Sequence, residues 1–325
     1  MKAIVCHEYG DICKLSLEEV DSLQPNDTEL LLKILAAGVN FPDGLLVQGL
    51  YQAKPETPFI PGMECCCEVL AMGTECTGFQ VGNRVICSNP KYGAFAEQLV
   101  IDYRSVIPAP TDIPPEQACN LLVAHGTAHH ALKQRGQLKA GENLVVLGAA
   151  GGTGIAAVQI GKAMGANVIA AASTNKKLAL AKEHGADHVF NYTTGNIKDG
   201  IREYTNGQGA DVIYDPVGGD IFDSSVRAMA RHGRYLVIGF ASGTIPKFPI
   251  NLALVKEFSL VGVFWGTFTR KEPKVFSENM QQLFKWHKDG LVSVNVDQTF
   301  ALKDTASALS YVMDRKVKGK VSIVI

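Results

Sequence analysis

The pattern of apolar and polar positions divides the chain into three stretches. Residues 1–120 hold short alternating or apolar runs broken by Gly and Pro, which predict a compact β-rich domain. Residues 121–263 alternate strand-like and helical patterns, which predicts a parallel sheet with right-handed crossovers. Residues 264–325 are less regular, with a predicted helix at Val275–Lys288 and a final strand at Lys320–Ile325.

A glycine-rich loop follows the first apolar run of the middle stretch. Residues 144–154 read Leu-Val-Val-Leu-Gly-Ala-Ala-Gly-Gly-Thr-Gly, and a helical pattern begins at once. Glycines permit a tight turn, let backbone amides approach a pyrophosphate and let helix and strand pack closely. The positive end of the helix would face the phosphates. The loop predicts a dinucleotide site with contacts at Gly148, Ala150, Gly151, Gly152, Thr153 and Gly154.

The end of the second predicted strand of this domain indicates which dinucleotide binds. NAD enzymes usually carry Asp or Glu there, to accept hydrogen bonds from the ribose hydroxyls. This chain has Ser173, nineteen positions past Gly154, and Lys177 follows shortly after. A carboxylate would repel a 2′-phosphate, whereas a hydroxyl and an ammonium would hold it. The sequence therefore predicts NADPH rather than NADH.

Composition narrows the classes of function. The chain has 325 residues, which favours two domains, and its net charge of −1 comes without a long basic run. This argues against nucleic acid or an anionic membrane as a partner. No apolar stretch approaches the ~20 residues of a membrane span, and the N-terminus turns polar too early for a signal peptide. We expect a cytoplasmic protein with a small-molecule substrate.

All eight cysteines lie in the first 119 residues. Three of them, Cys65–Cys67, are consecutive, and consecutive side chains of a strand project to alternating sides. We therefore expect no convergence of these thiols on a metal ion. Small buried apolar residues in a reducing compartment are the favoured interpretation, and a redox role for Cys65–Cys67 is the alternative.

Several short motifs occur in a characteristic order along the whole chain: Gly38–Asp43, Pro58–Glu64, Gly93–Glu97, Gly126–Ala128, Tyr214–Gly219, Val237–Gly243 and Gly262–Gly266. In this order the chain resembles the zinc-independent quinone oxidoreductases of the medium-chain dehydrogenase/reductase superfamily, in particular the quinone oxidoreductase-like 2 type. The resemblance implies an α/β fold with two domains. A β-rich GroES-like catalytic domain would comprise residues 1–120 and 264–325, and a Rossmann-type doubly wound parallel-sheet cofactor domain residues 121–263.

The positions that hold catalytic zinc in the superfamily's alcohol dehydrogenases are altered here. Asn40 stands where those enzymes have Cys, and Met63 where they have His, and neither is a normal zinc ligand. We therefore predict no metal. Quinone reduction needs no Lewis acid, because the acceptor is already electron-poor. By resemblance, Asn40 and Tyr51 are the catalytic residues, with Asn40 donating a hydrogen bond to a carbonyl and Tyr51 stacking on a flat ring or donating its hydroxyl proton.

Two positions depart from the quinone reductases. Leu45 stands where several of them have a second Tyr, and Gln48 stands near the place of a basic residue. A 2-alkenal or enone acceptor would use the same machinery, and an acyl-CoA thioester is a further alternative. A further alternative, from another class, is a non-catalytic NADPH-binding protein with a structural or RNA-binding role.

The resemblance assigns further cofactor contacts outside the glycine loop: Thr127, Ser173, Lys177, Tyr192, Phe240, Ala241, Phe264 and Trp265. The apolar run Phe258–Phe264 is predicted to be an edge strand of the dinucleotide sheet. An uncovered apolar edge favours pairing with its copy across a two-fold axis, so we expect a homodimer.

Overall fold

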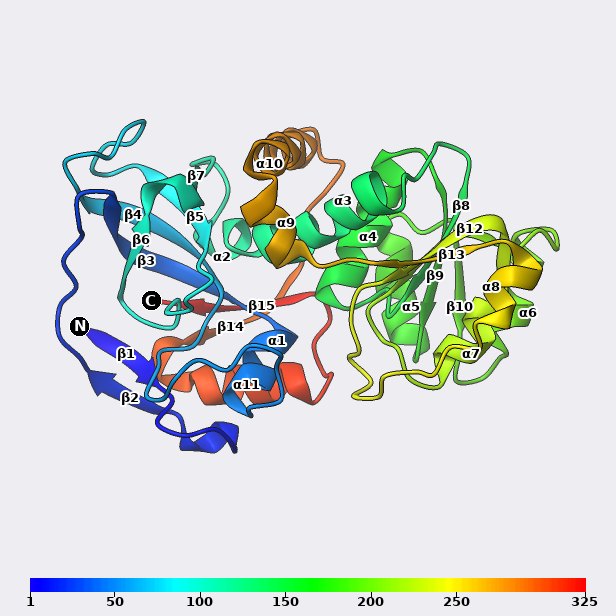
Figure 1. Cartoon of the computed structure of the whole chain (residues 1–325), viewed down its shortest axis with the longest axis horizontal. Helices are drawn as coiled ribbons and strands as arrows, with labels where there is room; N and C mark the ends of the chain where they lie inside the picture. Colours follow the sequence, from blue (N-terminus) through cyan, green and yellow to red (C-terminus); the bar gives the residue numbers. More distant parts are fainter. The chain divides into compact units, whose positions relative to one another are not determined.

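The computed structural model describes all 325 residues, which form two compact units (Figure 1). Unit 1 comprises Met1–Val123 and Val294–Ile325, and unit 2 comprises Ala124–Ser293. Both chain termini lie in unit 1, where the N and C labels stand in Figure 1. No helix is long and apolar enough to cross a membrane.

Unit 1 consists mainly of strands with short helices between them: β1 (Lys2–Val5), η1 (Ile12–Lys14), β2 (Ser16–Glu19), β3 (Glu29–Val39), α1 (Phe41–Val47), β4 (Glu64–Met72), β5 (Arg84–Ser88), β6 (Gln98–Asp102), η2 (Tyr103–Ser105), β7 (Val106–Pro108), α2 (Pro115–Ala118), β14 (Val296–Ala301), η5 (Leu302–Asp304), α11 (Thr305–Met313) and β15 (Lys320–Val324). The π-helical turn η3 (Leu121–His125) follows α2.

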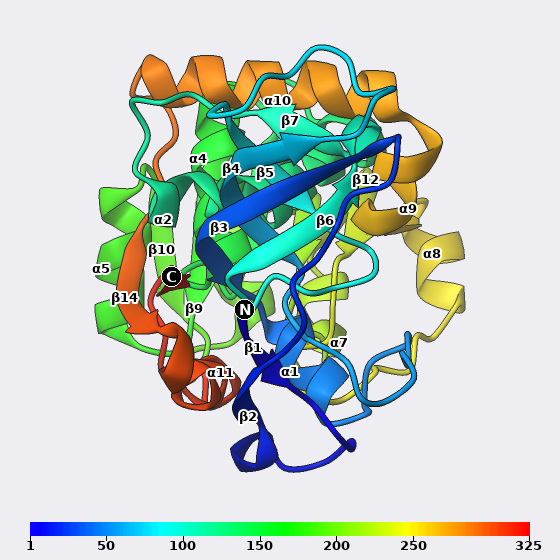
Figure 2. The same ribbon diagram turned by 90° about the vertical axis from the view of Figure 1, so that its left-hand side faces the viewer.

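The main sheet of unit 1 is organised around β3. Its strand order is β14-β15-β3-β4-β5-β7, and β6 also pairs with β3, beside which it lies in Figure 2. Alternate β3 residues Leu30, Leu32 and Ile34 are fully buried, as expected for a strand with one face in the core. The last strand, β15, pairs antiparallel with the end of β3. The C-terminal segment therefore completes the sheet that the N-terminal segment begins.

Unit 2 alternates strands and helices: α3 (Gly126–His130), η4 (Ala131–Arg135), β8 (Asn143–Leu147), α4 (Gly152–Ala163), β9 (Asn167–Ala172), α5 (Asn175–Glu183), β10 (His188–Asn191), α6 (Ile197–Tyr204), β11 (Ala210–Asp215), α7 (Ile221–Val226), β12 (Met229–Val237), α8 (Asn251–Lys256), β13 (Ser259–Gly262), α9 (Trp265–Lys271) and α10 (Pro273–Lys288).

The sheet of unit 2 is wholly parallel, in the order β10-β9-β8-β11-β12-β13. Helices α6 and α7 contribute to the apolar cluster on the face that carries Val145 and Ile169. Helix α4 packs on the opposite face, where Gly161 approaches the Leu144 side chain. Chain order reverses between β8 and β11, and open α/β sheets bind ligands at the carboxyl ends of such strands. The predicted doubly wound sheet is confirmed.

The boundary between the units differs from the expected one. Residues 264–293 were expected to belong with the β-rich domain, but they form part of unit 2, and the chain returns to unit 1 at Val294. Helix α10 buries Met280, and His129 of α3 hydrogen-bonds Gln282 of α10 at 3.1 Å. The amphipathic pattern predicts such a helix but contains no signal for the surface on which it packs.

The predicted edge strand is present. Strand β13 lies at one end of the unit 2 sheet and pairs only with β12. Leu260, in the middle of this strand, is 42% exposed. The strand thus presents apolar side chains at an open sheet edge.

Gly154 supplies a test of the helix–loop packing in unit 2. A Cβ built there would lie 2.3 Å from the Gly148 carbonyl oxygen, so Gly154→Ala must push α4 off the loop. We expect it to lower the free energy of unfolding by about 1–3 kcal/mol, measured by urea denaturation. Gly151→Ala is the matched control, since its Cβ would stand 3.5 Å from the same oxygen. Equal stability of the two variants would contradict this account of the packing.

Candidate active site

The glycine loop joins β8 to α4 through a turn that requires glycine. Gly148, directly after β8, has φ of 62°, which is in the left-handed region. The backbone N–H of Ala149 donates to the Ala171 carbonyl at 3.1 Å, which ties the loop to β9. Gly154 lets α4 approach the loop backbone, as described above. The local geometry is therefore that of the predicted dinucleotide loop.

The first turn of α4 forms a cradle suited to an anion. Gly151 is the N-cap residue, and no side chain caps the helix. The amides of Gly152, Thr153 and Gly154 therefore have no partner within the helix. A Cβ on Gly151 would meet nothing closer than the Gly148 oxygen at 3.5 Å, so this side of the loop is open. These residues fit a pyrophosphate, which the amides and the helix dipole would hold.

Thr153 has a second role that the sequence does not show. Its hydroxyl hydrogen-bonds the hydroxyl of Tyr214 on β11 and also approaches the Ala124 carbonyl at 3.4 Å. Burial raises the pKa of Tyr214, so that phenol stays protonated. The Thr153 side chain thus braces the loop against the sheet, and its backbone amide is the group suited to bind a phosphate.

Three of the predicted residues follow the carboxyl ends of β9 and β10. The parallel register pairs Asn191 with Ala172, so Ser173 and Tyr192 follow at neighbouring positions. The N–H of Tyr192 donates to the Ala172 carbonyl at 3.2 Å. Lys177 lies in the first turn of α5, which begins just after Ser173. A hydroxyl, a phenol and an ammonium therefore lie at one end of the sheet.

Phe240 and Ala241 lie at the carboxyl end of β12, as predicted. Asp215, at the end of β11, shapes the loop beside them by accepting hydrogen bonds from Gly218 N–H at 2.9 Å and from the Tyr235 hydroxyl at 2.7 Å. Ala241 N–H donates to the Pro216 carbonyl at 3.0 Å. The two strand ends are thereby held together at the edge where open α/β sheets bind ligands.

The remaining predicted cofactor residues differ in exposure. Phe264 is 55% exposed, whereas Trp265 is buried and its ring lies edge-on to Phe276. A Cβ on Gly126 would stand 2.9 Å from the Trp265 indole nitrogen, so this indole packs against α3 beside the partly exposed Thr127. Core packing in unit 2 accounts for Trp265, and Phe264 presents its ring at the surface.

In unit 1, Asn40 stands between β3 and α1 with its side chain held from two sides. Its amide nitrogen donates to Glu64 Oε1 at 2.8 Å, and its Oδ1 accepts a hydrogen bond from Lys320 Nζ at 2.5 Å. Lys320 Nζ also donates to the Val39 carbonyl, and Glu64 Oε2 accepts from Val123 N–H. An amide has two N–H donors, so one N–H of Asn40 can serve a substrate carbonyl.

Glu64 and Lys320 are functional candidates that the sequence analysis missed. The Glu64 side chain is fully buried, that of Lys320 is 6% exposed, and Nζ and Oε1 are 3.2 Å apart. Glu64 is the last residue of the motif Pro58–Glu64, and Lys320 lies near the C-terminal end of the sequence. No local signal joins these two residues, because only the order β15-β3-β4 makes them neighbours.

Asp43 and Tyr51 complete this part of unit 1. Asp43 is fully buried, its Oδ2 accepts a hydrogen bond from Asn40 N–H at 2.8 Å, and its Oδ1 has no partner. Burial raises the pKa of Asp43 to about 7. Burial also raises the pKa of the partly buried Tyr51, and the charge of Asp43 adds to the effect. Tyr51 therefore remains a proton-bearing hydrogen-bond donor at neutral pH.

The cysteines require a correction. We expected that the thiols of Cys65–Cys67 would not converge, because the side chains of one strand alternate between its two faces. That argument left out the neighbouring strand. Cys65 and Cys67 do share one face of β4, and Cys87 of β5 joins them, so that three sulfur atoms lie within 4.8 Å of one another. The pairing of β4 with β5 places Cys87 directly opposite Cys65.

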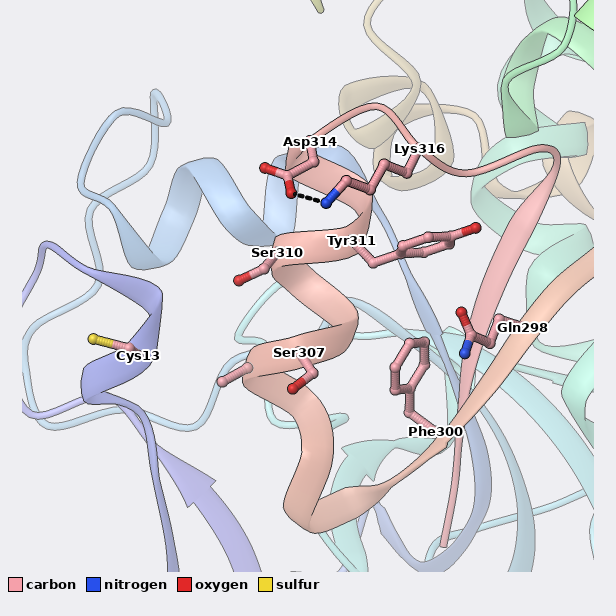
Figure 3. A pocket seen from close by; sticks show the side chains of 9 residues that line it. Cys13, Gln298, Phe300, Ser307, Ser310, Tyr311, Asp314 and Lys316 are labelled. Carbon is pink, nitrogen blue, oxygen red and sulfur yellow. Dashed lines mark hydrogen bonds and ion pairs between the residues drawn. The ribbon is translucent and has the colours of Figure 1, made fainter.

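An open cavity of about 490 Å³ lies elsewhere in unit 1, against β14 and α11 (Figure 3). Gln298 and Phe300 of β14 and Tyr311 of α11 line it, and Lys316 pairs with Asp314 at its rim. None of the predicted site residues lines this cavity. It is therefore separate from the candidate site.

Asp43 predicts a pH dependence of stability. Its folded pKa of about 7 lies above the ordinary 3.8, so the folded state keeps a proton that the unfolded state releases. This contribution is complete below pH 3.8 and disappears as the pH rises to 7, a loss of about 4 kcal/mol. Urea unfolding from pH 4 to 7 should show a steeper loss for the wild type than for Asp43→Asn. The exposed Asp112→Asn should behave as wild type, and parallel profiles for wild type and Asp43→Asn would refute the assignment.

Comparisons with known proteins agree with this geometry. Residues 26–111 match the alcohol dehydrogenase GroES-like domain, and residues 152–286 match the family described as zinc-binding dehydrogenase. Quinone oxidoreductase-like protein 2 of Rattus norvegicus is 36% identical, over 98% of this chain and 91% of its own length.

The solved structures that match the whole chain include two complexes with NADPH. A mycobacterial protein complexed with NADPH is 32% identical, with a TM-score of 0.93, and the match covers 100% of both chains. Escherichia coli quinone oxidoreductase complexed with NADPH is 26% identical, with a TM-score of 0.92 and the same coverage. The GroES-like and Rossmann-type architecture is thus confirmed. The chain belongs to the quinone oxidoreductase-like proteins of the medium-chain dehydrogenase/reductase superfamily, a family of oxidoreductases.

Proposed function

We propose that this protein is an NADPH-dependent, zinc-independent oxidoreductase that reduces quinones or related conjugated carbonyls. The observation that carries the proposal is the open cradle at the start of α4, with Ser173, Lys177 and Tyr192 together at the neighbouring strand ends. The amides of Gly152–Gly154 would hold the pyrophosphate, and Ser173 with Lys177 would hold the 2′-phosphate. When bound, NADPH supplies the two electrons of the reduction as hydride.

The acceptor would be held by unit 1 residues through hydrogen bonds. Lys320 and Glu64 fix the orientation of the Asn40 amide, so its remaining N–H is pre-set to meet a carbonyl oxygen on which charge develops. Tyr51 can donate its hydroxyl proton or stack on a flat ring. Delocalisation of charge over a quinone ring leaves positioning as the main task of the protein.

Zinc independence is supported by the contacts of Asn40. The Lys320 ammonium donates to Asn40 Oδ1 at 2.5 Å, so the oxygen at the position that matches a zinc ligand already has a partner. A metal ion would have to displace this ammonium before Asn40 could bind it. The amide of Asn40 and the thioether of Met63 are poor zinc ligands in any case.

A 2-alkenal or enone reductase is the second candidate, because the partly buried Leu45 makes the acceptor site more apolar than a second tyrosine would. Hydride addition at the β-carbon would use the same Asn40 donor. The non-catalytic alternative is not favoured, since the orientation of Asn40 has an evident catalytic use. The net charge of −1 gives no support for RNA binding.

A homodimer formed through β13 is also part of the proposal. The exposed Leu260 and the open edge of β13 would pair with their copies across a two-fold axis. Sedimentation equilibrium should report a dimer that Leu260→Lys weakens by about tenfold or more. Val81→Lys, at an exposed apolar position of unit 1, is the control. A monomeric wild type would refute the dimer.

A cytoplasmic location remains our expectation, because the eight cysteines are free thiols and a reducing compartment preserves thiols. Cell fractionation would test it. Recovery of the protein in an oxidising compartment would contradict it.

The function is tested by NADPH oxidation with EDTA-treated protein, offering a polycyclic ortho-quinone, a 2-alkenal or no acceptor. We expect rapid oxidation with the quinone and a rate with NADH at least about tenfold lower, because Ser173 and Lys177 favour a 2′-phosphate. Oxidation with the alkenal alone would assign the second candidate instead. Tight NADPH binding without turnover of either acceptor would refute the catalytic proposal.

Asn40→Ala tests the role of this residue in the same assay. Loss of one donor to a developing oxyanion should lower kcat by about 100-fold or more. Gln298→Ala, which alters the cavity of Figure 3, should leave kcat unchanged. The opposite pattern would move the acceptor site to that cavity.

A further inference from the structure

Three cysteine sulfur atoms form a compact buried group in unit 1. Cys65 and Cys87 face each other across β4 and β5 with Sγ atoms 3.5 Å apart, and Cys67 Sγ lies 3.3 Å from Cys65 Sγ. The exposed fractions of the three residues are 0%, 1% and 0% in the order Cys65, Cys87, Cys67. Proximity of this kind is what a single soft ion needs to bind all three thiolates.

The surroundings of this thiol cluster (Cys65, Cys67 and Cys87) are apolar. The strand register continues the row of Cys65 and Cys87 with Ala37 on one side and Val106 on the other. All of the cluster belongs to the hydrophobic core of unit 1. No nitrogen or oxygen ligand and no balancing cation is among these neighbours.

Hydrogen bonding to the neighbouring thiols and burial raise the pKa of Cys65, and burial raises the pKa of Cys67. Arg84 acts on Cys66, which alternates to the other face of β4.

The absence of a balancing cation limits the ions that this place can hold. A zinc ion prefers four ligands in a tetrahedron, and with three thiolates it would leave a net charge of −1 in the core. Cuprous ion with three thiolates would leave −2. Burying such a charge without a partner costs several kcal/mol. A trivalent element bound by three thiolates forms a neutral unit, which an apolar core accepts at the lowest cost.

We propose that Cys65, Cys67 and Cys87 form a binding site for a trivalent, thiophilic metalloid of the arsenite class. Three As–O bonds of As(OH)₃ break and three As–S bonds form. Each thiol proton leaves with one hydroxide as water, so three waters are released and no oxidation state changes. The product would cross-link β4 to β5 in the core of unit 1.

Entry requires local opening of the sheet, because the three thiols are buried. In the strand order of the sheet, β7 is the one strand beyond β5. It has three residues and forms the edge of the sheet. Short edge strands are among the elements that open at low free-energy cost. Loss of β7 would uncover β5, including Cys87.

The test uses the reduced full-length protein with sodium arsenite, both added to the native protein and present during refolding from urea. Native mass spectrometry should show one adduct with the mass of one arsenic atom less three hydrogens. X-ray absorption at the arsenic edge should show three sulfur neighbours. Arsenite should also raise the unfolding temperature, because the site exists only in the folded state.

Cys87→Ala should lower the arsenite affinity by about tenfold or more and remove the three-sulfur signature. Cys66→Ala is the matched control, because Cys66 is equally buried on the same strand but faces away from the cluster, and it should bind as wild type. Circular dichroism of each variant would establish that it folds. No uptake by native or refolded wild type, or unchanged binding in folded Cys87→Ala, would overturn the proposal.

Discussion

The buried contact of Lys320 with Glu64 and Asn40 joins three segments of unit 1 that are far apart in the sequence. Removing an ammonium and a carboxylate from water costs several kcal/mol for each ion. Here the cost is offset by their mutual attraction and by hydrogen bonds from Lys320 to Asn40 Oδ1 and to the Val39 carbonyl. The contact exists only if β15 lies beside β3 and β3 beside β4. The last strand of the chain is therefore required to hold Asn40, the proposed acceptor donor.

The same contact explains how the side-chain amide of Asn40 is held in one orientation. A surface asparagine would sample several rotamers and bind water. Asn40 is held at both ends of its side-chain amide, and its backbone N–H is held by Asp43. Its side-chain amide is thus oriented before any substrate arrives, which is the condition for effective electrostatic stabilisation. Asp43 is protonated below its pKa of about 7, because it is buried. In that form it holds the Asn40 backbone without placing a second negative charge beside Glu64.

The glycine loop of unit 2 depends on different physics. In unit 2 the groups that would hold the pyrophosphate are backbone amides, which every residue carries. What the sequence contributes there is the absence of side chains, at Gly148 for the turn and at Gly154 for the close approach of α4. Such a site can be recognised from spacing alone. In unit 1, by contrast, the polar cluster around Asn40 joins β3, β4 and β15, and the thiol cluster joins β4 to β5.

This difference divides what the sequence determined from what only the tertiary structure decided. Periodicity and glycine spacing predicted the parallel sheet, the β-rich unit, the edge strand and the dinucleotide loop, because each of these has a signal that can be read within a short stretch of sequence. The association of Lys320 with Glu64, the pairing of Cys87 with Cys65 and the packing of α10 on α3 were not predicted. Each depends on which strands or helices become neighbours, and the free energy that selects those neighbours comes from burying the whole core, which no local stretch of sequence encodes.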